Sequence, residues 1–182
     1  MEPIVLASAS PQRRAILEQL GVPFVVRPAA VEEVEEGDPA TVALTNARAK
    51  AAAVEGEHVL GVDTVVALDG RIYGKPADER DAAATLRALA GATHTVWSGI
   101  HLSGVGETAV ATAVTFRPLD NSWVEWYVAS DEWRDRAGGY AIQGRGAALV
   151  TRIEGDYTNV VGVPVAAFTE LLRTLGFPGK SR

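Results

Sequence analysis

The sequence contains no cysteine among its 182 residues. A disulfide framework, a thiolate zinc site and a cysteine nucleophile are therefore excluded, and cysteine content says nothing about the redox compartment. No apolar run approaches the roughly 18 residues that a membrane span requires. No basic segment followed by an apolar stretch comes after Met1, so a secretory signal is not indicated. We expect a cytoplasmic protein without a membrane partner.

Positive charge is also scarce. Lys and Arg total 17 against 23 Asp and Glu, the formal net charge is -6, and no basic run is longer than Arg13-Arg14. Because a nucleic-acid-binding face is strongly basic, we expect no nucleic-acid partner. A small anionic ligand needs only a few converging cations. A site for such a ligand has to be built locally, from particular residues.

The length and the hydrophobic content of 47% are typical of one globular domain, and no repeat or linker divides residues 1–182. Apolar periodicity and turn signals predict strands over residues 4–7, 24–27, 58–68, 71–73, 93–102, 108–116 and 147–153. They predict helices over residues 11–20, 38–54, 78–89, 122–129 and 165–175. Strands and helices thus alternate, with hairpins between some strands. This pattern predicts an α/β domain with a mixed sheet.

The first turn, within Leu-Ala-Ser-Ala-Ser-Pro-Gln-Arg-Arg, joins a predicted strand to a predicted helix. Ser10 lies at the N-cap position, and the free N–H groups of a first helical turn attract anions. Arg13 follows in that turn, where a cation opposes the helix dipole unless an anion neutralises it. The turn therefore predicts a phosphate site. In the alternative interpretation Ser10 only caps the helix and Arg13 points into water, and Arg14 is expected at the surface in both.

Asp63 interrupts an otherwise apolar predicted strand. A carboxylate there must be paired, bind a metal, or lie where the strand meets a cleft. Asp69-Gly70 predicts a tight hairpin turn, and folding the chain back at this turn brings Lys75 near Asp63. A purely structural salt bridge between Asp63 and Lys75 is the alternative. The acidic loop over residues 32–36 is expected to be solvated, although one of its members could join Asp63 on a divalent cation.

A glycine-rich segment surrounds Gln143 in Gly-Gly-Tyr-Ala-Ile-Gln-Gly-Arg-Gly. It lacks the Gly-Lys-Ser/Thr ending of a P-loop and the context of a dinucleotide fingerprint. The amide of Gln143 offers a donor and an acceptor, which suits the edge of a base, while a flexible loop is the alternative. The aromatic side chains that follow residue 120 are expected to pack in the core or between lobes: Trp123, Trp126, Tyr127 and Trp133.

Taken together, these segments resemble the Maf family of nucleoside triphosphate pyrophosphatases along almost the whole chain. The resemblance rests on several motifs in the same order: LASASPQRRAIL, GVDTVV, GKP, GGYAIQGRGA and GDYTNVVGVP. It implies two α/β lobes around a deep cleft, with a mixed and strongly twisted sheet as in Maf and Ham1-like proteins. It also implies hydrolysis of a nucleoside triphosphate to the monophosphate and pyrophosphate.

The resemblance further implies roles for particular side chains. The substrate-binding positions of the family match Ser8, Ser10, Arg13, Thr64 and Gln143. Its catalytic positions match Lys50, Asp63 and Lys75, and its metal-binding positions match Glu33 and Asp63, with Asp63 serving as base or as metal ligand. The implied cofactor is a divalent cation, Mg2+ or Mn2+. The implied partner is the nucleotide, and the resemblance allows a homodimer.

Differences within the family suggest a substrate. One subgroup, suited to a methylated guanine nucleotide, has Trp at the position of Gln12, Asp-Gln at residues 63–64 and Ser-Glu-Gly at residues 142–144. This chain instead resembles the dTTP and UTP subgroup, although many relatives have Arg at Gln12, Lys at Arg136 and Pro at Trp133. Two other functions stay open from the sequence. One is a nucleotide-binding regulator of cell division with little turnover, and the other is a sugar-nucleotide transferase.

Overall fold

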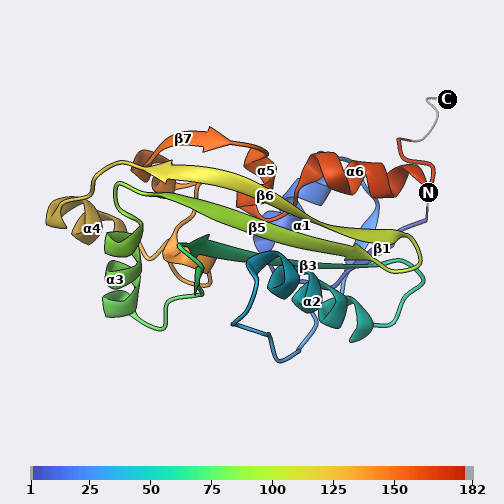
Figure 1. Cartoon of the computed structure of the whole chain (residues 1–182). Helices are drawn as coiled ribbons and strands as arrows, with labels where there is room; N and C mark the ends of the chain where they lie inside the picture. Colours follow the sequence, from blue (N-terminus) through green and yellow to red (C-terminus); the bar gives the residue numbers. More distant parts are fainter. Residues whose placement is uncertain (1, 179–182) are drawn as a thin grey trace.

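The apolar runs form the strands of one sheet in the computed structural model, which describes residues 2–178 (Figure 1). The strands are β1 (Ile4–Leu6), β2 (Phe24–Val26), β3 (Val59–Leu68), β4 (Arg71–Tyr73), β5 (Thr93–Leu102), β6 (Gly106–Phe116) and β7 (Val150–Glu154). The helices are α1 (Pro11–Gln19), α2 (Pro39–Ala52), α3 (Glu79–Leu89), α4 (Asn121–Val128), α5 (Tyr157–Val161) and α6 (Val165–Arg173). Two short 3-10 turns are η1 (Ala137–Gly139) and η2 (Arg145–Leu149).

The strand order is β2-β1-β3-β5-β6-β7, and β4 pairs with β3. β1 runs parallel to β2 and to β3, whereas β3, β5, β6 and β7 pair antiparallel in succession and β4 returns antiparallel onto β3. The α/β class and the mixed sheet are therefore confirmed, while the strong twist and the single domain stay predictions.

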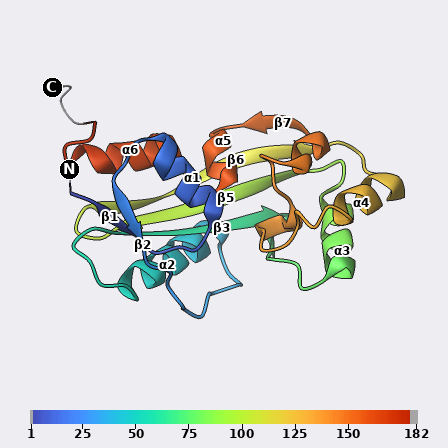
Figure 2. The same ribbon diagram turned by 180° about the vertical axis from the view of Figure 1, so that it is seen from behind.

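Helices cover the sheet unequally. α1, α5 and α6 lie over one face of the long strands, α2 lies against the other, and α3 and α4 stand at the far end, as Figures 1 and 2 both show. This arrangement leaves the middle of β3 between α1 on one side and α2 on the other.

Two apolar cores lie at opposite ends of the long strands. One joins α1 and α6 to β3 and β5 through Leu17, Phe168, Val62 and Ile100. The other joins α3 and α4 to the same strands and includes these buried residues: Val66, Leu86, Val96, Tyr127 and Trp133. On β3, only residues 63–65 separate the two cores. The expected two-lobed organisation is thus present, and both lobes share the same strands.

Local signals in the sequence place several element boundaries. Ser10 caps α1 by accepting the backbone N–H of Arg13, and Asp38 caps α2 in the same way through Thr41. Asp69 and Gly70 take positive φ values of 51° and 79°, as a two-residue hairpin turn requires.

Three expectations are wrong in detail. The last strand begins at Val150 and not at residue 147, because residues 145–149 form η2. There Gly146 packs so closely on Ala141 that a Cβ atom would lie 2.4 Å from the Ala141 carbonyl oxygen. The short helix α5 was not expected. Trp126 is 41% exposed, so it does not belong to the core, although Tyr127 and Trp133 do.

No helix within residues 2–178 is both long enough and apolar enough to cross a membrane.

His94, on β5, gives the fold a testable pH dependence. It is fully buried, its Nε2 lies 2.8 Å from the Tyr140 hydroxyl, and burial lowers its pKa from 6.5 to about 4. Between pH 6.5 and about pH 4, His94 is protonated in the unfolded chain but stays neutral in the folded chain. The free energy of unfolding therefore decreases as the pH is lowered through this window. In a His94→Gln variant, urea denaturation between pH 7 and 4.5 should show a shallower dependence. Equal slopes in the two proteins would contradict this account.

Candidate active site

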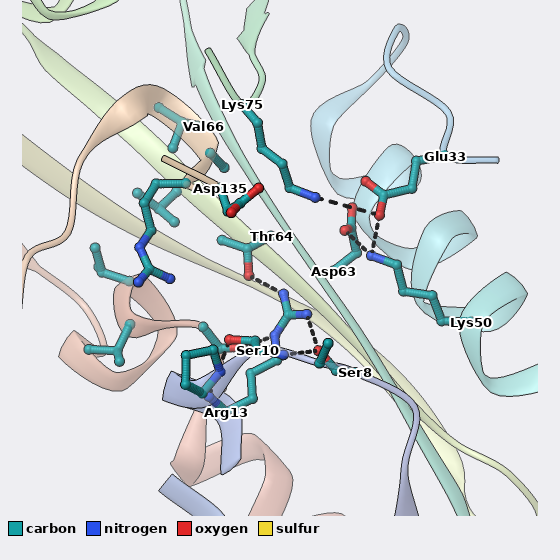
Figure 3. A pocket seen from close by; sticks show the side chains of 18 of the residues that line it. Ser8, Ser10, Arg13, Glu33, Lys50, Asp63, Thr64, Val66, Lys75 and Asp135 are labelled. Carbon is teal, nitrogen blue, oxygen red and sulfur yellow. Dashed lines mark hydrogen bonds and ion pairs between the residues drawn. The ribbon is translucent and has the colours of Figure 1, made fainter. Parts of the chain in front are cut away.

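The middle of β3 has no strand partner on one of its edges within the described residues. β1 pairs with Val59 and Leu60 and then ends, and β4 pairs with β3 only from Val66 onward. A cavity of about 480 Å³ opens beside this gap (Figure 3). It is lined by all nine residues to which the family resemblance gives a role: Ser8, Ser10, Arg13, Glu33, Lys50, Asp63, Thr64, Lys75 and Gln143.

Alternation along β3 sends neighbouring side chains to opposite faces of the sheet. Asp63 points toward α2, while Thr64 points toward α1, and the gap lets both reach the same cavity (Figure 3). α2 lies close to the sheet because Gly61 and Gly99 have no Cβ. A Cβ at Gly61 would stand 1.9 Å from the Ala47 carbonyl oxygen. This close approach places the Lys50 ammonium next to Asp63.

Arg13 is held inside the site. Its Nη1 donates to Ser8 Oγ at 3.0 Å, its Nη2 to Thr64 Oγ1 at 3.3 Å and its Nε to the Gly162 carbonyl oxygen at 3.1 Å. The alternative interpretation, in which Arg13 points into water, is therefore wrong. Burial lowers the pKa of Arg13, while the charges of Asp63 and Glu33 act to raise it, and an arginine stays protonated. All three bonded acceptors are neutral, so the guanidinium charge is available to an anion.

The C-terminal motif forms the wall behind Arg13. Asp156 caps α5 by accepting the N–H of Thr158 at 2.7 Å, and Gly162 at the end of this helix supplies the carbonyl that Arg13 binds. Asn159 is fully buried and donates to Thr112 Oγ1 at 2.9 Å and to the Val96 carbonyl oxygen at 3.1 Å. The motif thus contributes backbone groups and a fixed helix. The sequence signal for α5 is the Asp156 cap followed by Thr and Asn.

A polar chain links this wall to β3. Thr64 Oγ1 lies 2.8 Å from Ser98 Oγ, and Ser98 donates to the Asn159 carbonyl oxygen at 3.1 Å. Ser98 is fully buried on β5, directly opposite Thr64 in the sheet register. The hydrogen bond to Ser98 therefore fixes the orientation of the Thr64 hydroxyl toward Arg13.

Acidic and basic groups alternate on the other side of the cavity. Lys50 Nζ lies 2.6 Å from Asp63 Oδ1 and 2.8 Å from Glu33 Oε1, and its side chain is 9% exposed. Lys75 Nζ lies 3.9 Å from Glu33 Oε1. Lys75 lines the same cavity as Asp63, as expected. The alternative of a structural Asp63–Lys75 salt bridge is wrong, because Asp63 pairs with Lys50 from α2. Partial burial acts to raise the pKa of Glu33, but the hydrogen bond and charge of Lys50, with the neighbouring cations, hold it below its ordinary value.

The chemistry of the two carboxylates suits a hard divalent cation. Glu33 and Asp63 converge on one ammonium group, so their oxygens lie within the reach of a single ion. Among residues 2–178 no third His, Cys, Asp or Glu completes a cluster with them. Mg2+ is commonly held by one or two carboxylates, with waters and substrate phosphates completing its octahedron. The donor set fits that mode, with Lys50 occupying the space between the carboxylates.

Comparison with known proteins follows the same motifs. The family model described as Maf-like protein matches residues 3–175. The chain belongs to the Maf family. Curated relatives named dTTP/UTP pyrophosphatase include one from an Anaeromyxobacter species, 49% identical over 96% of this chain and 90% of the relative. Others come from Deinococcus radiodurans, 48% identical over 95% and 93%, and Moorella thermoacetica, 46% identical over 97% and 96%.

A solved structure is also similar at a greater distance. It is a nucleoside-triphosphatase, or dITP/XTP pyrophosphatase, from Mycobacterium abscessus, 20% identical with a TM-score of 0.42, covering 65% of this chain and 76% of that one. At this distance the likeness carries no information about substrate.

Three positions of this Maf chain depart from the residues expected in many relatives. Arg136 lines the cavity and its Nη1 donates to Gln12 Oε1 at 2.6 Å, whereas Trp133 is buried in the core. Gln143 is exposed and lines the cavity near Tyr140. The sequence associated Arg136 with the cleft only as a departure that could alter its rim, and it did not assign Tyr140 to the site, because only the folded loop brings Tyr140 there.

Arg13 and Arg14 provide a matched test of the phosphate turn. Arg13→Ala removes a half-buried cation with three acceptors and should weaken binding of inorganic tripolyphosphate by about 1.5–3 kcal/mol, the scale of a charge-assisted hydrogen bond. Arg14→Ala breaks only an exposed ion pair with Glu18, so it should weaken tripolyphosphate binding by less than about 1 kcal/mol. Calorimetric titration of both variants makes the comparison. Equal losses at the two positions would contradict the prediction that Arg13, and not Arg14, contacts the anion.

Proposed function

We propose that this chain hydrolyses dTTP and UTP to the nucleoside monophosphate and pyrophosphate. The observation that carries the proposal is the gathering, in one cavity, of all nine residues that match the family motifs. The names of the full-length curated relatives support the same activity and the same nucleotides.

The basic residues of the cavity suit a triphosphate, which brings about four negative charges and gains leaving-group charge on cleavage. Arg13 and Ser10, at the N-terminus of α1, would bind phosphate oxygens on one side. Lys50 and Lys75 would bind them on the other. These groups are held in place before substrate arrives, which is the condition for electrostatic stabilisation of a transition state.

Glu33 and Asp63 would hold a divalent cation, Mg2+ or Mn2+. When bound, such an ion supplies positive charge to the phosphate oxygens. Asp63 lies next to the expected phosphate position, and its carboxylate would either accept a proton from the attacking water or serve as a ligand of the ion. Lys50 would then keep the neighbouring carboxylates charged.

Recognition of the base is assigned to Gln143. Its neutral amide can donate to and accept from the edge of a pyrimidine, whereas a carboxylate at this position would suit a donor-rich or cationic purine. We further propose that the 182 residues act as one functional unit in the cytoplasm with no nucleic-acid partner, and that a homodimer is one form it can take.

Release of pyrophosphate from nucleotide alone tests the proposed function against the two alternatives. A pyrophosphatase releases it from dTTP and UTP without further additions. A nucleotide-binding regulator would release none, and a sugar-nucleotide transferase would need a sugar phosphate. No release from either nucleotide, with Mg2+ or Mn2+ present, would overturn the proposal.

The carboxylates are expected to be essential in different ways. Asp63→Asn should keep the fold, because Lys50 retains Glu33 as a partner, and should lower kcat about 100-fold or more. Glu33→Gln should also lower turnover, but high Mn2+ should partly restore it if this residue holds the cation. Kinetics across a metal titration, with circular dichroism of each variant, provide the measurement. A folded Asp63→Asn variant with near-normal kcat would refute the assignment.

The substrate preference is a separate prediction. We expect higher kcat/KM for dTTP and UTP than for ATP, GTP or 7-methyl-GTP, because Gln143 and the pair Asp63-Thr64 match the pyrimidine subgroup. Kinetics of all five nucleotides at one metal concentration decide the point. A clear preference for 7-methyl-GTP would overturn the subgroup assignment and leave the pyrophosphatase activity intact.

A further inference from the structure

Asn46 is a buried amide on α2, one helical turn before Lys50, and it is only 2% exposed. The faces of this helix that meet the sheet are otherwise built largely from alanine and valine. Burying an amide costs free energy unless its polar atoms are hydrogen-bonded. Both polar atoms of Asn46 are bonded, and all of their partners belong to the carboxylate side of the candidate site.

The first partner is Asp63. Asn46 Nδ2 lies 3.0 Å from Asp63 Oδ2, while Lys50 Nζ holds Oδ1 at 2.6 Å. Each oxygen of this carboxylate therefore has its own donor, and both donors come from α2. Two donors at fixed positions define the plane of the carboxylate, so Asp63 cannot rotate without losing a bond.

The second partner is the loop that carries Glu33. The Val34 N–H donates to Asn46 Oδ1 at 2.8 Å, and Asn46 Nδ2 donates to the Val34 carbonyl oxygen at 2.9 Å. Among residues 28–37, all of which the structure describes, no other backbone group is hydrogen-bonded. The Val34 side chain is 44% exposed, so apolar burial does little to hold the loop here. Asn46 supplies the hydrogen bonds that tie this loop to the body of the protein.

We propose that Asn46 is a positioning residue that fixes the two carboxylates of the site relative to each other. It orients Asp63 directly and sets the position of Glu33 through the adjacent Val34. The inference rests on the proposed function, since it assigns Asn46 a part in the turnover that Asp63 and Glu33 support. Residues that orient ligating or catalytic carboxylates typically contribute 10- to 100-fold to activity or metal affinity.

Two substitutions test the proposal. Asn46→Leu keeps the size of the side chain and removes all three hydrogen bonds. Asn46→Asp keeps the acceptor for the Val34 N–H but faces Asp63 with a carboxylate in place of a donor. We expect kcat for dTTP to fall about 10- to 100-fold in both, with KM changed less than about threefold, because the phosphate-binding groups around Arg13 are untouched.

Val42→Ala is the matched control. Val42 lies one turn earlier on α2, is equally buried and packs in an apolar cluster with Ala43 and Val65, so its truncation should destabilise the helix packing while the hydrogen bonds of Asn46 stay in place. We expect this variant to lose thermal stability while its kcat stays within twofold of the wild type. If Asn46→Leu does not fold, Asn46→Asp against the same control decides the question.

Amide hydrogen exchange supplies a readout that does not depend on turnover. In Asn46→Leu the amides of residues 31–36 should exchange faster than in the wild type and in Val42→Ala. A folded Asn46→Leu protein with kcat within twofold of the wild type would overturn the proposal, as would unchanged exchange in this loop. If the wild type releases no pyrophosphate, the proposed function fails instead, and the exchange result still shows whether Asn46 holds the loop.

Discussion

A missing strand pairing is the constraint on which the site depends. β1 is only three residues long, and β4 pairs with the far part of β3, so one edge of β3 is open between them. Were β1 longer, its residues would pair along this edge and fill the cavity. An open strand edge also presents backbone N–H and C=O groups, which must find water or a ligand as partners. Through this gap, one ligand can reach side chains from both faces of the sheet. It can also reach the backbone polar groups that lie between them.

The two faces contribute opposite chemistry. On the α1 side, Arg13 is held by hydroxyls and a carbonyl, which fix its direction without neutralising its charge. On the α2 side, Lys50 is neutralised by two carboxylates within 2.8 Å. Burying an ion pair such as Lys50 and its two carboxylates costs desolvation free energy, which the attraction between the charges only partly offsets. A hydrophobic cluster would stabilise this position at least as well, so the charged residues are better explained by the site than by the fold.

The sequence predicted those parts of the structure that depend on local signals. The cap at Ser10 and the turn at Asp69-Gly70 follow from neighbouring residues, and so do nearly all of the strands. Residue types and turn geometry also predicted the phosphate site at Arg13 and the approach of Lys75 to Asp63. The full membership of the cavity was predicted only through the motif resemblance, since no local signal shows which acidic residue of the loop approaches Asp63. The pairing of Asp63 with Lys50 was not predicted, because it depends on how closely α2 packs. That distance is set by Gly61 and Gly99, which lie far from Lys50 in the sequence.

The contacts of Asn46 were likewise not predictable from local sequence signals. In the sequence it is one polar residue in an alanine-rich helix, and its partners at Val34 and Asp63 lie 12 and 17 positions away. Under the proposed function, Lys50 turns toward a phosphate and a divalent cation takes its place between Glu33 and Asp63. The charge between the two carboxylates then changes, and with it the force that draws the loop of Glu33 toward Asp63, unless a neutral group fixes the loop. The amide of Asn46 keeps its bonds whatever the charge between the carboxylates, which is why an uncharged residue suits this position better than a second lysine.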